Sequence, residues 1–261
     1  MNASSFALPE ALVPYEERIR NSVKPFIRIV AQPTNELTLL QSKFGGDPYW
    51  PARHDYPNDF QGHLLYLLAQ INCAELPALE GFPASGLLQF YVANEPMYGL
   101  NLDDLRDQTN FRVVYFAEFD ENAALRDFSF LDANEDLPIT QSYALTFEKQ
   151  WAPVAPEAMT FEQIFEMSPY EFFDQFDEDV KQEYLKLAAP QGHKIGGYAH
   201  FTQEDPRFWD EEYEDYQLLL QIDSEGEGIV WGDRGIGNFF IKPADLHNLD
   251  FSKVLYHWDN P

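Results

Sequence analysis

The sequence predicts an α+β fold built mostly of antiparallel sheets, in two similar halves with a few flanking helices. Two observations carry this prediction. Strand-like segments gather near both ends of the 261-residue chain, whereas the longest helical pattern lies between them. In addition, several short motifs recur at a constant distance along the chain, which indicates an internal duplication.

The first part of the chain is predicted to begin with a helix and to continue as strands. Residues 9–22 show a helical pattern, with Pro9 near the first turn. The strands expected after it are 26–32, 36–42, 64–72, 86–92, 111–119 and 142–151. Residues 64–72 form a continuous apolar run, which predicts a strand buried on both faces.

The middle of the chain carries a helix-start signal. Ser168 is placed as an N-cap, Pro169 as the first helical residue and Glu171 as the partner in a capping box. Apolar residues then recur at helical spacing, so we expect one amphipathic helix over 169–188 with an acidic outer face. The strands expected after it are 218–223, 228–232, 237–243 and 253–258.

Three motifs recur 151 residues further along the chain. Lys43-Phe-Gly-Gly returns as Lys194-Ile-Gly-Gly, and the apolar run 67–72 returns as 218–223. The glycine pair 81 and 86 also returns as 232 and 237. We therefore expect a single domain over 1–261, with repeat halves at about 37–119 and 190–259.

The charge is the strongest signal of the composition. The chain has 44 Asp and Glu against 17 Lys and Arg, a formal net charge of −27. Such a charge repels nucleic acid and anionic lipid, so neither is an expected partner, and it attracts a basic partner. The alternative is that acidic side chains only keep the protein soluble.

Several kinds of chemistry lack a signature in the sequence. The one cysteine, Cys73, follows an apolar run and is expected to be a buried thiol. The histidines form no metal motif, no GxSxG elbow is present, and we expect no cofactor and no metal. The start of the chain has no signal-peptide pattern and no stretch is apolar enough to span a membrane, so we expect a cytoplasmic protein.

Two acidic clusters favour a protein-binding surface. Residues 171–183 carry six acids, and residues 204–216 carry seven acids interleaved with four aromatic residues. Aromatic side chains supply contact area and carboxylates attract a basic partner, although a solvated loop would show the same composition. The predicted partner-binding residues are Asp174, Asp177, Glu178, Trp209, Asp210, Glu211, Glu212 and Glu214.

A second hypothesis places an anionic small molecule on the glycine-containing loops. Lys43 and Lys194 could each present an ammonium beside paired glycines, and Asp233 and Arg234 lie in a loop that lacks a counterpart in the first half. These four residues are the predicted ligand-binding set, in a cleft between the halves. The alternative is structural, because glycines also permit tight turns and close strand approach.

The motifs resemble those of the YwqG family, a bacterial family of unknown function. The similarity is carried in order by SKFGGDPYWP, LLYLLAQINCAELP, GLLQFYV, KIGGYAHFTQEDPR, LLLQIDS and WGDRGIGNFFI. The resemblance implies an internally repeated α+β protein without an established enzyme activity. Relatives are often encoded near toxin genes, which implies an immunity protein that neutralises a basic toxin. An enzyme of unrecognised type remains a further hypothesis.

Overall fold

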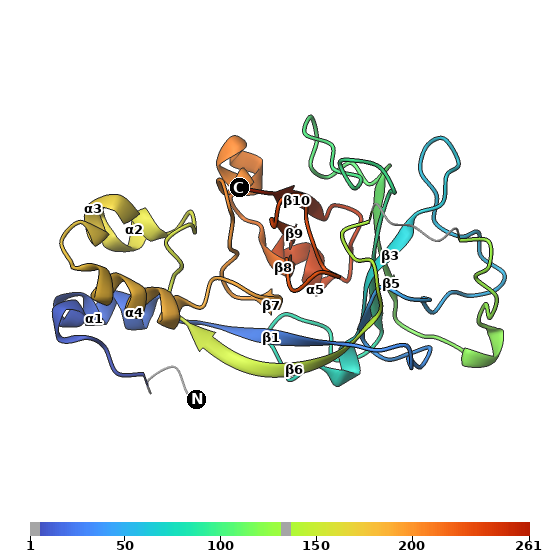
Figure 1. Ribbon diagram of the computed structural model, residues 1–261, viewed down its shortest axis with the longest axis horizontal. Helices are drawn as coiled ribbons and strands as arrows, with labels where there is room; N and C mark the ends of the chain where they lie inside the picture. Colours follow the sequence, from blue (N-terminus) through green and yellow to red (C-terminus); the bar gives the residue numbers. More distant parts are fainter. Residues whose placement is uncertain (1–5, 132–136) are drawn as a thin grey trace.

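The computed structural model describes residues 6–131 and 137–261 as a ten-stranded antiparallel sheet with short helices at one end (Figure 1). The strands are β1 (Lys24–Pro33), β2 (Lys43–Phe44), β3 (Tyr66–Asn72), β4 (Leu87–Val92), β5 (Phe111–Phe116), β6 (Tyr143–Ala152), β7 (Lys194–Gly196), β8 (Gln217–Asp223), β9 (Ile236–Ile241) and β10 (Leu255–Asp259). The helices are α1 (Glu16–Asn21), α2 (Phe161–Phe165), α3 (Pro169–Phe173), α4 (Glu178–Ala188) and α5 (Pro243–His247).

The strand order is β10-β9-β8-β7-β1-β6-β2-β3-β4-β5. The two central strands, β1 and β6, pair over their full length, from Lys24 opposite Ala152 to Pro33 opposite Tyr143. In Figure 1 this long ribbon runs along the bottom of the molecule, from the helices to the far strands. The prediction of an α+β protein with mostly antiparallel strands therefore agrees with the structure.

The main core lies where the two ends of the curled sheet face each other. The rings of Phe90 in β4 and Phe239 in β9 are 4.8 Å apart, and those of Phe111 in β5 and Tyr256 in β10 are 5.0 Å apart. The five central residues of both β3 and β8 are buried, which confirms the strand predicted from the apolar run 64–72. Burial on both faces explains why these strands lack an alternating pattern.

Helices α1 to α4 form a helical lobe with its own aromatic core. Phe161, Phe165 and Phe172 pack there around the fully buried Tyr184. The hydroxyl of Tyr184 donates to the carbonyl of Val154, directly after β6, at 2.9 Å. The lobe is thus fixed to the central ribbon of the sheet.

The prediction of one continuous helix over 169–188 is wrong. The chain leaves the helix after Phe173 and re-enters it at Glu178, and Asp177 between them has an extended backbone. Asp is a weak helix former that favours caps and turns. The break also lets Phe173 contact Tyr184 while Phe176 packs against Tyr15.

The start of α3 is as predicted. The Ser168 hydroxyl accepts the backbone N–H of Glu171, and the Glu171 carboxylate accepts the backbone N–H of Ser168 at 2.9 Å. Pro169 occupies the first turn, so the expected capping box is confirmed. Within the two described ranges, no helix is long and apolar enough to cross a membrane.

Two further predicted strands, 36–42 and 228–232, are wrong. The carbonyls of residues 39–41 accept hydrogen bonds from the side chains of Gln70 and Asn72, so they are unavailable to a neighbouring strand. In the second segment only Ile229 makes strand-like bridges. Gly232 then adopts the left-handed region at φ 50°, which turns the chain into β9.

Candidate functional site

Lys43 is a buried lysine whose ammonium binds backbone carbonyls of the neighbouring loops. Its side chain is 2% exposed, and the ammonium donates to the carbonyls of Thr38 (2.8 Å), Leu39 (3.3 Å) and Asp47 (3.0 Å). Burial lowers the pKa of Lys43 to about 8, while the carboxylates of Asp47 and Glu75 oppose that shift. Three acceptors match the three donors of an ammonium group, so none is left for a ligand.

Lys194 lies in an equivalent environment 151 residues later. It is also 2% exposed and donates to the carbonyls of Ala189 (2.6 Å) and Pro190 (2.7 Å). Burial lowers the pKa of Lys194 to about 7, against the opposing effect of the Asp223 and Glu157 carboxylates. Two acceptors can be satisfied by a neutral amine, which has two donors.

The strand beside each lysine carries a buried glutamine with the same role. The side-chain amides of Gln70 and Gln221 both donate to loop carbonyls: to Leu39 and Gln41 for Gln70 (2.9 and 3.0 Å), and to Pro190 and Gly192 for Gln221 (3.0 and 2.7 Å). An anion at Lys43 or Lys194 would have to displace these carbonyls. The geometry therefore supports the structural alternative, and the ligand role of the two lysines stays a prediction.

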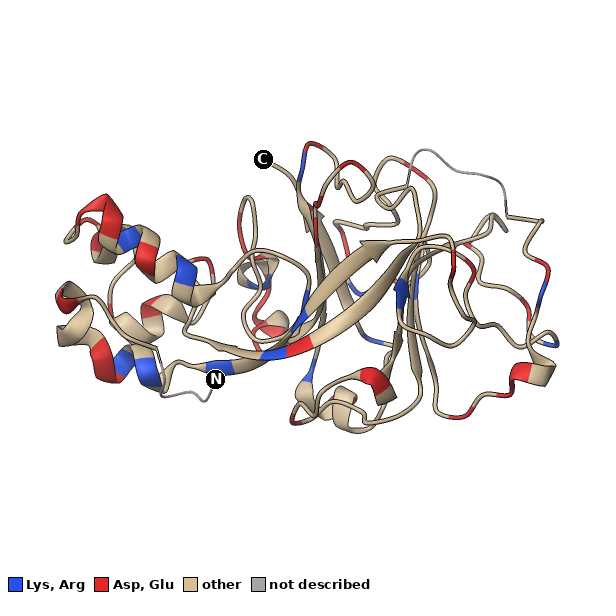
Figure 2. Ribbon diagram, turned by 60° about the horizontal axis from the view of Figure 1, so that its bottom comes forward, with Lys and Arg blue, Asp and Glu red and all other residues tan. Residues whose placement is uncertain are grey.

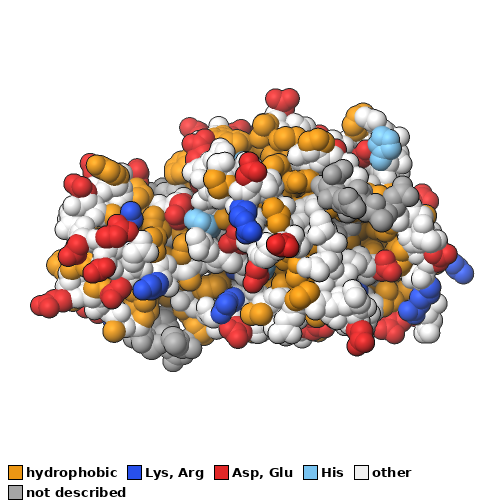
Figure 3. Space-filling model, viewed as in Figure 1, with side chains coloured by type: hydrophobic (Ala, Val, Ile, Leu, Met, Phe, Trp, Pro, Cys, Tyr) orange, Lys and Arg blue, Asp and Glu red, His pale blue; other side chains and the backbone are white. Residues whose placement is uncertain are grey.

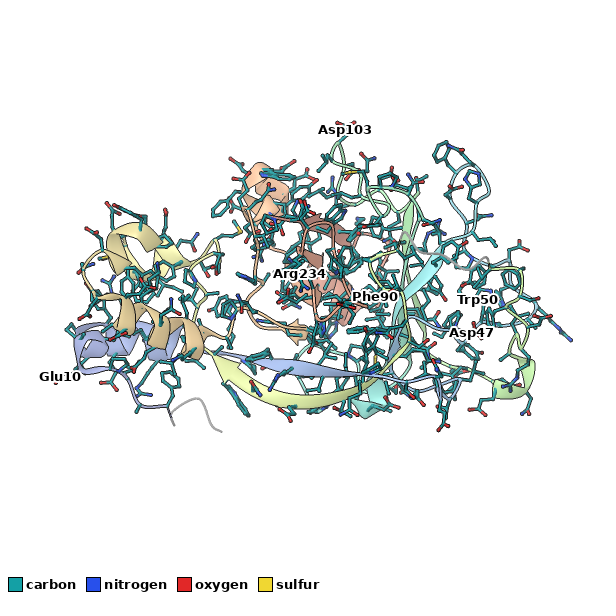
Figure 4. The ribbon with its side chains drawn as sticks, viewed as in Figure 1. Glu10, Asp47, Trp50, Phe90, Asp103 and Arg234 are labelled. Atoms are coloured by element: carbon teal, nitrogen blue, oxygen red, sulfur yellow. The ribbon has the colours of Figure 1, made fainter. Side chains whose placement is uncertain are left out.

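Asp233 and Arg234 lie on an exposed turn before β9. Arg234 has a left-handed backbone (φ 74°), and its guanidinium donates to the Gly226 carbonyl at 3.4 Å. Figure 4 shows Arg234 well apart from Asp47, whose carbonyl binds Lys43, so the structure does not bring these loops together. At Gly237 a β-carbon would lie 2.3 Å from the Trp231 ring, so this glycine permits close packing.

The acidic residues predicted for partner binding on the helices are all on the surface of the helical lobe. Asp174, Asp177 and Glu178 are exposed, and Figures 2 and 3 show that acidic residues gather on the helical lobe. In the described ranges, no carboxylate of α3, of α4 or of the break between them forms a salt bridge. Their charge is therefore available to a partner.

A groove of about 420 Å³ opens between α3 and α4. Its apolar lining includes Tyr170, Phe173 and Leu185. Its charged lining has three carboxylates, those of Glu157, Asp174 and Glu178, against the one ammonium of Lys181. Tyr170 is 79% exposed, an unusual state for a large aromatic side chain at a folded helix start. The sequence prediction missed Tyr170. Its place directly after Pro169, in the outward-facing first turn, is the signal that could have identified it.

The 204–216 segment carries the second predicted group. Trp209 is 46% exposed, its indole N–H donates to Glu204 at 2.8 Å, and its ring edge meets His257 with centroids 5.2 Å apart. The buried carboxylate of Asp205 holds the Arg207 guanidinium and so fixes the start of the segment. The structure thus presents Trp209 rigidly rather than on a loose loop.

The four acids that follow Trp209 are exposed but differ in their partners. Glu212 forms an ion pair with Arg106 at 2.9 Å, and Asp210 accepts the backbone N–H of Glu212. Glu211 and Glu214 make no salt bridge within the described part of the chain. Figure 1 shows this segment, in orange, separated from the helical lobe, so the eight predicted residues form two patches.

The part of the chain that the structure describes holds no group of three or more His, Cys, Asp or Glu side chains placed to bind a metal ion. Cys73 is buried, and burial raises the pKa of its thiol to about 12, so the thiolate is scarce at neutral pH. The two acidic patches and the groove are therefore the strongest candidates for a surface through which this protein binds a partner.

The fold and these surfaces define an α+β protein with one curled antiparallel sheet and acidic, partly apolar faces. Residues 42–260 match the family described as a domain of unknown function (DUF1963), and the chain belongs to that family. A search among curated proteins finds no match to the sequence.

Proposed function

We propose that this protein binds a basic protein partner through the groove of its helical lobe, with the 204–216 segment as a second contact. The observation that carries the proposal is the groove itself. Its aromatic lining, with the exposed Tyr170, offers contact area, and the carboxylates of Asp174 and Glu178 at its side form no salt bridge with any described residue. Aromatic anchors surrounded by charge are typical of protein interfaces.

The charge of the whole chain supports the same partner chemistry. A net charge of −27 accelerates the approach of a basic protein and disfavours acidic competitors. Because surface charges are screened within about 10 Å at 0.1 M salt, only the carboxylates close to the groove act on the bound partner. The attraction of a basic protein by the net charge and its recognition by the carboxylates at the groove are thus separate contributions to binding.

The finer assignments are also proposals. Resemblance to YwqG proteins supports an immunity protein of the cytoplasm, whose partner would be a basic toxin. A single domain with duplicated halves at about 37–119 and 190–259 is supported by the matching lysine and glutamine contacts. The irregularity in the pairing of β3 at Leu67/Ala69, matched in β8 at Leu218/Leu220, is also consistent with duplication.

The proposal is tested with a fluorescent peptide of about twelve residues that carries lysines and leucines at helical spacing. Binding is followed by fluorescence anisotropy for the wild-type protein, for Asp174→Lys with Glu178→Lys, and for Asp210→Lys with Glu211→Lys. Glu36→Lys with Glu121→Lys, two exposed changes on loops outside both patches, alters the net charge by the same amount and is the control.

We expect the helical-lobe variant to weaken binding at least about tenfold, because it places two like charges beside the groove. The Glu36→Lys and Glu121→Lys control should weaken it by less than about twofold. Equal losses for the groove and control variants would show binding to net charge alone and would overturn the proposal. Where a toxin gene neighbours this one, survival on co-expression of the toxin with the same variants tests the immunity assignment.

A further inference from the structure

A second hollow lies where the helical lobe meets the sheet, and its charge is opposite to that of the protein. The volume is about 450 Å³, and the polar side chains around it include those of Arg18, Asn21, Lys24, Thr160, Gln163 and Tyr198. No Asp or Glu lines it, although the chain has 44 of them. The two acidic patches described above use none of these residues.

Lys24, the first residue of β1, is an exposed cation at this hollow. Its Nζ lies 4.5 Å from the centre of the Tyr198 ring, and no carboxylate among the described residues pairs with it. The side chain keeps an exposed face, but the surrounding protein lowers the pKa of Lys24, and the nearby Arg207 guanidinium lowers it further. An anion would relieve both effects.

The platform under Lys24 is rigid. Tyr198 is 8% exposed, and its hydroxyl donates to the carbonyl of Ser22 at 2.6 Å. The Ser22 hydroxyl in turn accepts the backbone N–H of Val154 at 3.1 Å. These bonds join α1, β6 and the loop after β7, so the hollow is pre-formed in the fold rather than made by mobile side chains.

Other polar groups around the hollow make no hydrogen bond to the described part of the chain. The Thr160 hydroxyl is one of them, but its oxygen is buried and is therefore closed to a ligand in the hollow. The side-chain amides of Asn21 and Gln163 make no hydrogen bond either within the described ranges. Arg18 is already engaged, by the carbonyls of Ile164 and Phe165 and by the exposed Glu166, so it mainly holds α2 in place.

We propose that this hollow binds a small molecule bearing a phosphate group, with the Lys24 ammonium and the exposed side-chain amides of Asn21 and Gln163 as its principal donors. Phosphate oxygens accept several hydrogen bonds at once, which matches one cation surrounded by neutral donors. The volume lies within the usual range of small-molecule sites. In a strongly acidic protein, an anion requires a local lining without acids, and here that lining includes a lysine that pairs with no carboxylate of the described residues.

The test is calorimetric titration with inorganic phosphate and with glycerol phosphate, at constant ionic strength. The variants are Lys24→Ala, Lys24→Arg and Gln163→Ala, and Lys186→Ala on the exposed side of α4 is the control for lost charge. Melting temperatures without ligand identify variants that fail to fold. Peptide binding by Lys24→Ala is measured in parallel, because the proposed protein-binding groove does not include Lys24.

We expect Lys24→Ala to weaken glycerol phosphate binding about tenfold or more, and Lys24→Arg to retain it within about threefold. Gln163→Ala should weaken it by a smaller factor, and Lys186→Ala should leave it unchanged. Absence of binding to the wild-type protein at millimolar concentration, or equal binding by wild type and Lys24→Ala, would overturn the site. Peptide binding by Lys24→Ala should be unchanged. The test of the phosphate site is then independent of the test of the protein-binding groove.

Discussion

Lys194 shows how a buried base can couple the stability of this protein to pH. The pKa of Lys194 is about 7 in the folded state, below its ordinary value of 10.5. Between these two values the unfolded chain binds more protons than the folded one, so the free energy of unfolding rises with pH. The neutral amine keeps both carbonyl contacts, to Ala189 and Pro190, which makes a folded, uncharged form possible.

We predict that the free energy of unfolding of the wild-type protein increases more between pH 7.5 and 9 than that of Lys194→Met. The difference should be on the order of 2 kcal/mol, since one pH unit is worth about 1.4 kcal/mol for a full proton. Urea titrations over this range measure it, and contributions from other groups cancel in the comparison. Lys186→Met, an exposed change, serves as the control. Parallel pH profiles for wild type and Lys194→Met would contradict the assignment.

At the scale of the element, the capping box fixes where α3 begins and therefore how Tyr170 is presented. Hydrogen bonds from the backbone N–H and hydroxyl of Ser168 lower the pKa of the Glu171 carboxyl. We predict that Ser168→Ala destabilises the helical lobe by about 1 kcal/mol, whereas Ser168→Thr retains the cap. Amide exchange in α3 measures the effect. Equal protection in the alanine and threonine variants would show that the packing of Phe172 alone holds the helix.

The elements also show what the sequence could and could not predict. The apolar run of β3 and the start of α3 were predictable because each depends on neighbouring residues. The loop 36–42 was not, because its carbonyls are bound by Gln70 and Asn72, some thirty positions later in the chain. Local propensity carries no information about such distant partners.

The candidate binding surfaces also include some features that the sequence could predict and others that it could not. The acidic residues of both patches were recognisable from composition, and the seven acids and Trp209 of the predicted set are exposed residues in the structure. Their role in binding stays a prediction. The groove beside Tyr170 depends on the break between α3 and α4, which one continuous helical pattern concealed. The hollow at Lys24 joins residues far apart in the chain, Lys24 and Tyr198, so only the fold reveals it.

At the scale of the whole molecule, the two ends of the sheet share one core. Phe90 and Phe239 are both fully buried, lie on strands from opposite ends of the sheet, and have ring centroids 4.8 Å apart. If the two ends of the sheet were independent domains, a substitution at Phe90 would leave the amide hydrogen exchange of β8 and β9 unaffected. A shared core instead makes the protein unfold as one cooperative unit.

We predict that Phe90→Ala and Phe239→Ala each lower the free energy of unfolding by about 3 to 5 kcal/mol. The double variant should lose less than the sum, because the second change removes a contact that the first has already broken. The expected coupling is about 0.5 to 1.5 kcal/mol, the usual value for an aromatic pair. Urea unfolding measures it, with amide exchange followed separately in β3–β4 and in β8–β9. Additive losses, or loss of protection confined to the mutated end, would contradict a common core and leave the two ends of the sheet as separate folding units.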